Sequence, residues 1–355
     1  QFLGYGNSGA PGDGTSSNYA WPTMVSNASL NHSTIVSFDA GGYGNASNVA
    51  ACVITSAGSN NMWCWGNSYT NINGAGSDVN LPSQITGYTW KNVSIGLGLV
   101  ACGVTTANAG YCWGYQQYFG LGNNVNAGSY LYTPQAIVGV SPPGGWDHIS
   151  VGGYYPVGTA HYAIACGISM TGNRMWCWGS DVWGQIGNGV GGPNPTQPVE
   201  VTTLAGQWAR VRAGGNHVCA RTLSNQLYCW GYGGHGQIGN GVAASVDAPT
   251  LVPLPSGVTS WADFETGAKH NCAIANTGSL YCWGQNNYGQ IGDGTATQRN
   301  SPTLVVGGKR WKEVSVGDLL TCATDTNSRM WCWGYNAKGQ LGNGTTTTNY
   351  LPQPV

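Results

Sequence analysis

The chain has 355 residues, of which only 7% are charged, and its formal net charge at pH 7 is −1. An average soluble domain has roughly 25% charged residues, so this surface is poor in charge. The 12 Lys and Arg residues are scattered, which excludes a phosphate-binding surface and makes nucleic acid an unsuitable partner. No segment approaches the ~20 apolar residues of a membrane span, and the protein is not expected to cross a membrane.

The chain begins with Gln1 and without a charged-then-apolar leader, so we interpret it as a processed mature protein. Solubility normally comes from charged side chains, and here glycans or burial in an assembly would have to compensate. Five N-x-S/T sequons are possible glycosylation sites, at Asn27, Asn31, Asn45, Asn92 and Asn343. Because Asn, Ser and Thr are abundant, several sequons are expected by chance.

Internal repetition organises the chain. A Gly-rich half-repeat (1–24) comes first, six cysteine-containing repeats follow (25–335), and a second Gly-rich half-repeat (336–355) comes last. We predict that all of them belong to one domain, 1–355. Short alternating runs between Gly-containing turns predict an all-β fold.

Each of the six repeats contains a pair of cysteines. The second cysteine of each pair begins a Cys-Trp-Gly tripeptide, and the first lies 10 to 12 positions earlier. The pairs are Cys52 and Cys64, Cys102 and Cys112, Cys166 and Cys177, Cys219 and Cys229, Cys272 and Cys282, and Cys322 and Cys332. Two alternating runs around a turn lie between them, which predicts a β-hairpin with both cysteines facing each other on one side.

Three interpretations of these cysteines are open. Cysteine is common as a small buried hydrophobe, and zinc is a second alternative, although the pairs lack C-x-x-C spacing. Six matching pairs favour one disulfide in each hairpin, contributing about 2.5 kcal/mol each in the chain-entropy model. Disulfides on this scale predict a secreted, cell-surface or periplasmic location, of which we expect an extracellular one, secreted or at the cell surface.

A Gly-rich half-repeat follows each hairpin, as in Gly184-Gln185-Ile186-Gly187 and Gly289-Gln290-Ile291-Gly292, and a strand opened by Trp comes next. These motifs resemble the regulator-of-chromosome-condensation repeat family, with its G-x-x-H-x-C-A … C-W-G-x-N-x-x-G-Q-L-G-x-G-T pattern. The resemblance covers essentially the whole chain and is most specific in repeats four to six. It implies a seven-bladed β-propeller with one four-stranded blade per ~50 residues. Six complete blades plus an extra half-blade is the alternative.

The repeat count is uneven, because seven Gly-rich halves accompany only six cysteine hairpins. Two equivalent halves at the two ends cannot complete the same blade. We hypothesise that one half pairs outside its own chain, which would allow assembly by strand addition. The protein would then be a self-assembling subunit or an adhesin-like protein.

Aromatic residues in irregular segments are candidate binding residues. They are Tyr118, Phe119, Tyr130, Tyr132, Tyr154, Tyr155 and Trp183. Aromatic rings also stack on sugars, so a lectin-like, glycan-binding propeller that uses the Tyr-rich third repeat is the alternative function. Equally, these side chains would pack beneath their own loops.

The sequence offers little for catalysis. Its only glutamates are Glu200, Glu265 and Glu313, and all cysteines are assigned to hairpins. His217 and His270 occupy the family's G-x-x-H-x-C position, where a structural hydrogen bond is expected. We therefore predict no catalytic residue, metal or cofactor, and an extracellular, non-enzymatic binding or structural scaffold with a protein partner.

Overall fold

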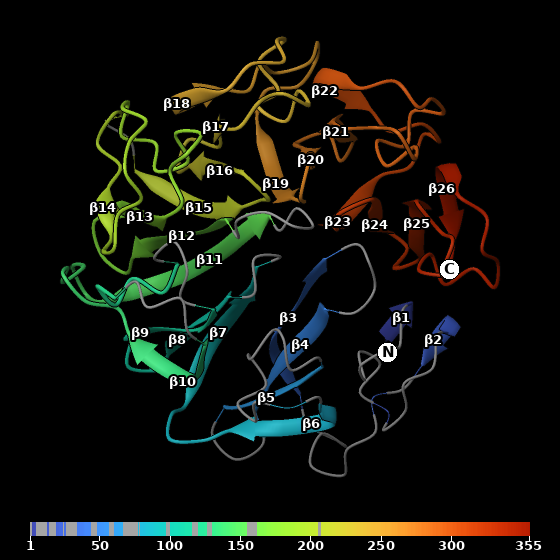
Figure 1. Cartoon of the computed structure of the whole chain (residues 1–355). Helices are drawn as coiled ribbons and strands as arrows, with labels where there is room; N and C mark the ends of the chain where they lie inside the picture. The colour runs from blue at the N-terminus through green and yellow to red at the C-terminus, as the bar shows by residue number, and fades with distance from the viewer. Residues whose placement is uncertain are drawn as a thin grey trace.

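Six four-stranded antiparallel sheets are arranged around a common centre in the computed structural model (Figure 1). The structure describes residues 2–4, 13, 19–23, 25, 34–43, 48–56, 60–66, 77, 79–96, 100–115, 120–125, 130–154, 162–204 and 207–355. Every regular element within these residues is a β-strand. We call the six sheets blades 1 to 6 in chain order.

The first three blades are formed by the strands up to Glu200. Blade 1 contains β3 (Ile35–Tyr43), β4 (Asn48–Thr55), β5 (Asn61–Gly66) and β6 (Val79–Ile85). Blade 2 contains β7 (Trp90–Ile95), β8 (Val100–Thr105), β9 (Gly110–Tyr115) and β10 (Tyr130–Ala136). Blade 3 contains β11 (Trp146–Tyr154), β12 (Tyr162–Ser169), β13 (Met175–Gly179) and β14 (Val199–Glu200).

The other three blades are more regular in length. Blade 4 contains β15 (Trp208–Ala213), β16 (His217–Thr222), β17 (Leu227–Gly231) and β18 (Val246–Leu251). Blade 5 contains β19 (Trp261–Thr266), β20 (His270–Ala275), β21 (Leu280–Gly284) and β22 (Arg299–Leu304). Blade 6 contains β23 (Trp311–Val316), β24 (Leu320–Asp325), β25 (Met330–Gly334) and β26 (Asn349–Pro354).

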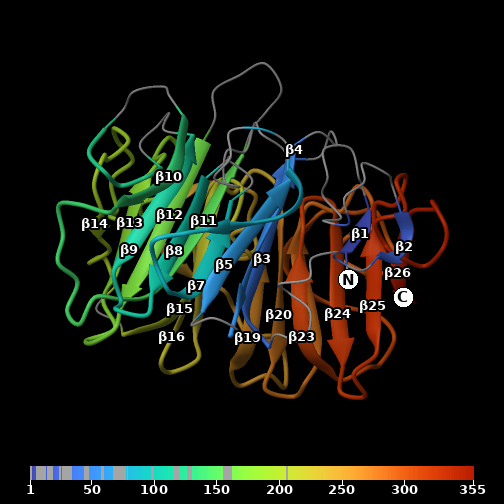
Figure 2. The same ribbon diagram turned by 90° about the horizontal axis from the view of Figure 1, so that it is seen from below.

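The prediction of seven blades is wrong. The described residues form six four-stranded sheets and one two-stranded sheet, β1 (Phe2–Gly4) with β2 (Tyr19–Thr23). The C-terminal Gly-rich half pairs within its own chain, because β26 completes blade 6 against β25. Within the described residues, the N-terminal half contributes β1 and β2, which lie beside β26 in both views (Figures 1 and 2). Six blades plus an extra half-blade, the alternative, agrees with this arrangement, since a seventh cysteine hairpin is missing from the sequence.

The predicted disulfides are confirmed. All six pairs are bonded, and each joins the two central strands of its blade. The two cysteines of each pair lie directly opposite in the strand register, as for Cys272 and Cys282 in blade 5. The larger separations in blades 1 and 3 are absorbed by longer turns, so the pairing itself is unchanged.

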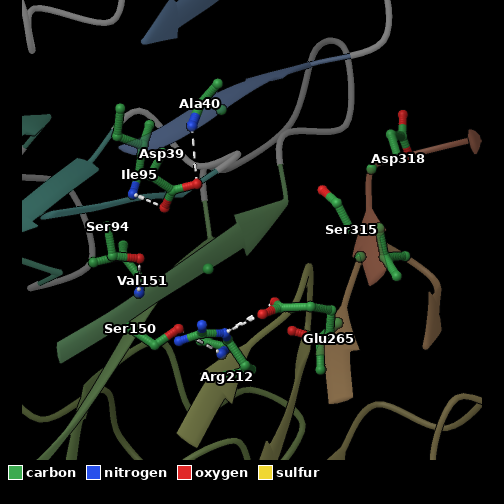
Figure 3. Close-up of a pocket in the computed structure, with 18 of the residues that line it drawn as sticks. Asp39, Ala40, Ser94, Ile95, Ser150, Val151, Arg212, Glu265, Ser315 and Asp318 are labelled. Atoms are coloured by element: carbon green, nitrogen blue, oxygen red, sulfur yellow. Dashed lines mark hydrogen bonds and ion pairs between the residues drawn. The ribbon is translucent and has the colours of Figure 1, made fainter. Parts of the chain in front are cut away.

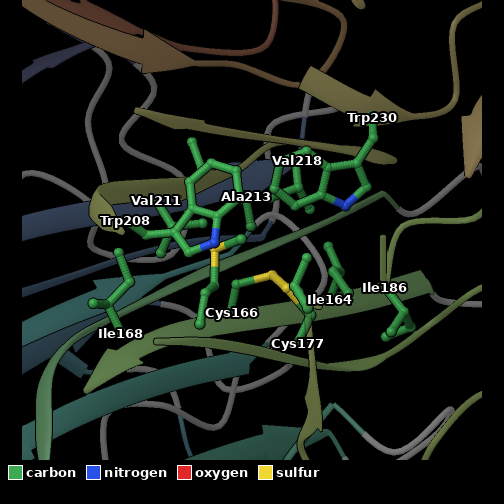
Figure 4. Packing of buried hydrophobic residues seen from close by; sticks show 13 residues of the cluster. Ile164, Cys166, Ile168, Cys177, Ile186, Trp208, Val211, Ala213, Val218 and Trp230 are labelled. Atoms are coloured by element: carbon green, nitrogen blue, oxygen red, sulfur yellow. A yellow bond between two sulfur atoms is a disulfide. The ribbon is translucent and has the colours of Figure 1, made fainter. Parts of the chain in front are cut away.

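Tryptophan packing joins consecutive blades. Trp208, which opens the inner strand of blade 4, packs with Trp230 of the same blade at 6.1 Å between ring centroids. The same core cluster contains Cys166 and Cys177 of blade 3 (Figure 4). The disulfide face of one blade is therefore covered by the tryptophan face of the next, and this burial of large aromatic surface is the main attraction between blades.

The Gly-Gln-x-Gly turn has a defined role in this packing. The side-chain Oε1 of Gln290 accepts the N–H of Tyr288 (2.9 Å), which closes the turn. Its backbone carbonyl accepts the indole N–H of Trp333 in the next blade (2.9 Å). Gln237 accepts from Trp283 in the same way. The motif therefore satisfies the buried indole N–H that the Cys-Trp-Gly sequences of blades 4 to 6 bring into the core.

The two predicted structural histidines are fully buried and hydrogen-bonded across blades. His217 Nε2 lies 2.7 Å from Asn271 Oδ1, and His270 Nε2 lies 2.9 Å from Thr321 Oγ1. Thr321 donates its own hydroxyl proton to the Gln290 carbonyl, so His270 must be the donor to Thr321. The expected structural role of this position is confirmed.

Candidate functional site

The inner strands β3, β7, β11, β15, β19 and β23 line a central cavity of about 1060 Å³ (Figure 3). One residue from each strand recurs around it, four positions after the residue that opens the strand. These residues are Asp39, Ser94, Ser150, Arg212, Glu265 and Ser315, and each pairs in register with the first cysteine of its blade. We call them the channel ring. The fixed offset from the opening Trp was visible in the sequence, but we did not predict the channel ring from it.

The first three members of the channel ring accept a backbone hydrogen bond from the next blade. Asp39 Oδ2 accepts the N–H of Ile95 (2.8 Å), and Ser94 Oγ accepts that of Val151 (3.0 Å). Ser150 Oγ accepts the N–H of Ala213 (3.0 Å). Each bond satisfies an inner-strand N–H that points to the neighbouring blade, so this position joins adjacent blades.

The fourth and fifth members, Arg212 and Glu265, join their blades through an ion pair instead of a hydrogen bond to the backbone. Arg212 cannot accept a hydrogen bond, and its Nε lies 2.9 Å from both carboxylate oxygens of Glu265 in the next blade. Arg210 also contacts Glu265 and pairs with Asp263. Burial alone would lower the pKa of Arg212, but Glu265 raises it above its ordinary value. Blades 4 and 5 are thus joined across the channel by ion pairs.

We expect the variant Glu265→Ser to lose about 3 kcal/mol of stability, because it leaves Arg212 in the channel without its carboxylate. The double variant Arg212→Ser/Glu265→Ser removes both charges and restores the hydroxyl used in blades 2 and 3. It should lose only about 1 kcal/mol. Guanidinium unfolding of both variants under non-reducing conditions measures this difference. A double variant no more stable than the single one would contradict the interpretation.

Asp39 has an unusual charge state for a carboxylate. Burial raises its pKa to about 6, while the hydrogen bond from Ile95 and the charge of Arg212 act in the opposite direction. It is therefore partly protonated in mildly acidic solution. The folded protein binds this proton more tightly than the unfolded chain, so Asp39 contributes stability that is lost as the pH rises through about 6.

His148 links blades 3 and 4 at the wall of the same cavity. Its Nδ1 lies 3.0 Å from Asp147 Oδ2, and its Nε2 accepts the N–H of Val211 at 3.2 Å. Burial lowers the pKa of His148, so its ring is neutral at pH 7 with the proton on Nδ1. Both ring nitrogens are engaged, which leaves this histidine in a structural role.

Glycines two positions beyond the channel ring let adjacent inner strands approach closely. A Cβ at Gly152 would lie 2.0 Å from the carbonyl oxygen of Gly214, and one at Gly267 would lie 2.1 Å from that of Gly317. Gly317 of blade 6 differs, because the atom nearest to a Cβ added there would belong to its own blade, at Leu320, 3.5 Å away. The close contact with a following blade therefore ends at blade 6.

The facing sides of blades 6 and 1 each carry one exposed apolar side chain, although Trp65 on this side of blade 1 is buried and Val25 packs against its cluster. Met330 of β25 is 46% exposed, whereas Met175, Leu227 and Leu280 at the same position of other blades are buried. Ile35 opens β3 and is 63% exposed, whereas the five tryptophans that open the other inner strands are buried. We call the space bounded by Ile35 and Met330 the ring opening. The sequence signal for it is the Ile in place of Trp at the start of β3, from which we made no prediction.

The described residues include no group of three or more His, Cys, Asp or Glu side chains positioned to bind a metal ion. Nowhere in this part of the chain is there a helix of the length and apolar character that a membrane crossing requires.

The predicted aromatic binding residues are not brought together as one surface. Tyr130 stacks on Tyr115 at 4.7 Å and Tyr132 is exposed on the same outer strand, β10. Tyr154 ends the inner strand β11, and Trp183 packs against Tyr232 after β13. Tyr118, Phe119 and Tyr155 lie outside the described residues, so a Tyr-rich site in the third repeat stays a prediction.

Two of the predicted sequons fall in the described part of the chain. The Asn92 side chain donates its amide to the carbonyl of Asp147 (3.0 Å) within the inner wall of the ring. Asn343 closes a Gly-rich turn, with Oδ1 accepting from the Thr345 hydroxyl (2.8 Å). Asn27, Asn31 and Asn45 lie outside the described residues. Glycosylation stays a prediction.

The second half of the chain matches a known sequence family. The family described as Regulator of chromosome condensation (RCC1) repeat matches residues 224–274, 277–324 and 327–355, and a second description of the same repeat matches 208–237, 261–290 and 311–340. The matched segments coincide with blades 4 to 6, where the Gly-Gln-x-Gly turns are complete.

The similarity to one curated protein covers most of the chain, beyond blades 4 to 6. The chain is 30% identical over 318 residues to human "E3 ubiquitin-protein ligase HERC2", which covers 85% of this chain. It is 28% identical over 151 residues to "Ultraviolet-B receptor UVR8" of Arabidopsis thaliana, which covers 41% of this chain. These matches span only 6% and 34% of the respective relatives.

Solved structures show the same fold at low sequence identity. Human WBSCR16 superposes with a TM-score of 0.75 at 17% identity, covering 91% of this chain and 82% of that one. Prp20p from Saccharomyces cerevisiae superposes with a TM-score of 0.71 at 18% identity, covering 90% and 76%. These similarities establish the propeller architecture alone.

Proposed function

The chain belongs to the family of RCC1-repeat β-propellers, and from this premise we propose that it is an extracellular, non-enzymatic scaffold that associates with a second copy of itself through the ring opening. The observation that carries the proposal is the exposure of Ile35 and Met330, whose counterparts are buried at the other blade interfaces. Five interfaces bury the counterparts of these two side chains between consecutive blades, so Ile35 and Met330 remain as apolar surface suited to burial.

The outer edges of the blades are less suited to association. Proline interrupts the outer strand of five blades, at Pro82, Pro134, Pro249, Pro302 and Pro352. Proline removes a backbone donor and discourages edge-to-edge strand pairing. Strand addition around the rim is therefore disfavoured, and the ring opening is the better place for a partner.

The charge of the chain favours a second copy as the occupant. A formal net charge of −1 gives two copies almost no long-range repulsion. With 7% charged residues, the surface also gains little from remaining fully hydrated. A symmetric contact in which each copy covers the other's ring opening would bury the apolar faces of both.

Two further features support the location and the absence of catalysis. Six disulfides are stable in an oxidising compartment and are rare in reducing ones. The polar groups of the channel ring are largely engaged in joining blades, as Asp39, Ser94 and Arg212 illustrate. The cavity thus supports a structural and binding role better than a catalytic one.

We expect the variant Ile35→Lys/Met330→Lys to weaken self-association by more than about tenfold, because each copy places two charges in the contact. Light scattering after size-exclusion chromatography, over a range of concentrations, measures the association. The wild-type protein should shift from monomer to dimer as the concentration rises.

The matched control is Val242→Lys/Leu304→Lys, which adds the same charge at two other exposed apolar positions. This control should associate like the wild type. A wild-type protein that stays monomeric at high concentration would overturn the proposal, as would an equal loss of association in the control.

A further inference from the structure

A second cavity, of about 230 Å³, lies where the turns of blades 3, 4 and 5 meet. Its lining includes Trp183 from blade 3, Tyr232 and His235 from blade 4, and Lys269 from the start of blade 5. It is separate from the channel ring and from the ring opening, and neither of those features accounts for it.

Aromatic side chains form the wall of this cavity. The rings of Trp183 and Tyr232 are 4.9 Å apart at 60°, and those of Tyr232 and His235 are 5.7 Å apart at 76°. Trp183 is 41% exposed although it packs against Tyr232. A partly exposed indole beside a cavity offers a flat apolar surface for a ligand to stack on.

Two buried polar atoms without hydrogen-bond partners belong to residues that line the same cavity. Gln237 is fully buried, and its Oε1 accepts the N–H of His235 (2.9 Å), which leaves its Nε2 unpaired. Asn216 Oδ1 is also buried and unpaired. One is a donor and the other an acceptor, and buried groups of this kind are normally satisfied. A ligand hydroxyl that reaches the first would accept its hydrogen bond, and one that reaches the second would donate to it.

Comparison with the next repeat shows what is particular to this cavity. Gln290 Nε2 is unpaired as well, so the turn of blade 5 shares this feature, whereas Gln185 Nε2 in the turn of blade 3 donates to Ser180 (3.3 Å). The position of Asn216, however, is occupied by Lys269 in blade 5 and by Leu319 in blade 6. Only here, among the described turns of blades 4 to 6, does a buried unpaired asparagine oxygen accompany the glutamine beneath an aromatic wall.

The charges of the residues that line the cavity favour an uncharged ligand. The described residues that line the cavity include no carboxylate, and Lys269 lies among them, which disfavours a cation despite the aromatic rings. Burial, together with the charge of Lys269, lowers the pKa of His235, so that ring is neutral at pH 7. The cavity therefore combines an apolar stacking surface with one donor and one acceptor.

We propose that this cavity binds one neutral hexopyranose residue of a glycan, with the sugar ring stacked on Trp183 and its hydroxyls bonded to Asn216 Oδ1 and Gln237 Nε2. The C–H face of a pyranose is apolar and matches the indole face, while adjacent ring hydroxyls supply both a donor and an acceptor. A few convergent polar groups under an aromatic wall are typical of small-ligand sites. The inference does not depend on self-association through the ring opening.

The test uses the methyl glycosides of glucose, galactose, mannose and N-acetylglucosamine as probes, with saturation-transfer NMR and titration calorimetry. We expect at least one of them to bind with a Kd of about 1 mM, as a single small ring allows. Trp183→Ala and Asn216→Ala should each weaken that binding more than about tenfold. Circular dichroism of each variant verifies that the fold is retained.

Tyr288→Ala is the matched control, because Tyr288 lies two residues before Gln290 as Trp183 does before Gln185, and it packs on Tyr335 at 4.9 Å. Binding by this variant should equal that of the wild type. Failure of all four probes to bind the wild type would overturn the proposal. So would a loss in Tyr288→Ala as large as that in Trp183→Ala, since binding would then lie elsewhere on the aromatic rim.

Discussion

Substitution of Gly267 by alanine is expected to destabilise the ring by about 3 kcal/mol and to lower the Tm by about 4 °C. The added methyl would lie 2.1 Å from the backbone carbonyl oxygen of Gly317 in the next blade. A backbone atom cannot rotate away as a side chain can, so blades 5 and 6 would have to separate. That separation would also loosen the packing of Trp311 against the disulfide face of blade 5.

Gly317→Ala is the matched control, at the same position of blade 6. The nearest atom to its new methyl would be Leu320 Cγ at 3.5 Å, an ordinary van der Waals contact. This variant should shift the Tm by less than about 1 °C. Differential scanning calorimetry with the disulfides intact compares the two. Equal losses would indicate that blade 6 is followed by a close neighbour after all, and would contradict the ring opening.

The blades themselves could be predicted from the sequence because their signals are local. Cys272 and Cys282 are close in the chain, and alternation with a Gly-containing turn fixes their register. The opening Trp and the Gly-Gln-x-Gly turn recur at fixed offsets, and their packing follows from those offsets. The predicted hairpins, disulfides and structural histidines are accordingly confirmed.

Closure of the ring could not be predicted in the same way, because it depends on how distant segments share one surface. The two Gly-rich halves look alike in sequence, yet one completes blade 6 as β26 and the other forms β1 and β2. Arg212 and Glu265 come together only when blades 4 and 5 are adjacent. Nothing in the sequence marks Asn216 and Gln237 as candidate binding residues. Whether their polar atoms find a hydrogen-bond partner depends on how the turns pack against one another.

Acidification is expected to lower the stability of the protein through the two buried histidines, His217 and His270. Burial lowers the pKa of His217 to about 4 and that of His270 to about 3. In both rings Nε2 is hydrogen-bonded and Nδ1 is buried without a partner. Protonation would place a charged N–H where no acceptor is present, which explains why the folded protein resists it.

The sign of the effect follows from proton binding. Below pH 6.5 the unfolded chain takes up protons on these histidines, while the folded protein does not until about pH 4 or below. Stability therefore falls as the pH is lowered, by about 1.4 kcal/mol per pH unit and histidine. Asp39 and Asp181, whose pKa values burial raises to about 6, act in the opposite direction. The total pH dependence is a balance, and single variants are needed to separate its parts.

His270→Leu isolates the histidine contribution, because Leu320 occupies the same position in blade 6. Between pH 7 and pH 4 the wild type should lose about 3 kcal/mol relative to this variant, whatever their difference at pH 7. Asp39→Asn is the control of opposite sign, since the wild type should gain stability relative to it on acidification. Guanidinium unfolding at several pH values measures both differences. A His270→Leu difference that does not change with pH would mean that this imidazole is protonated in the folded ring, and that the hydrogen bond to Thr321 does not hold it neutral.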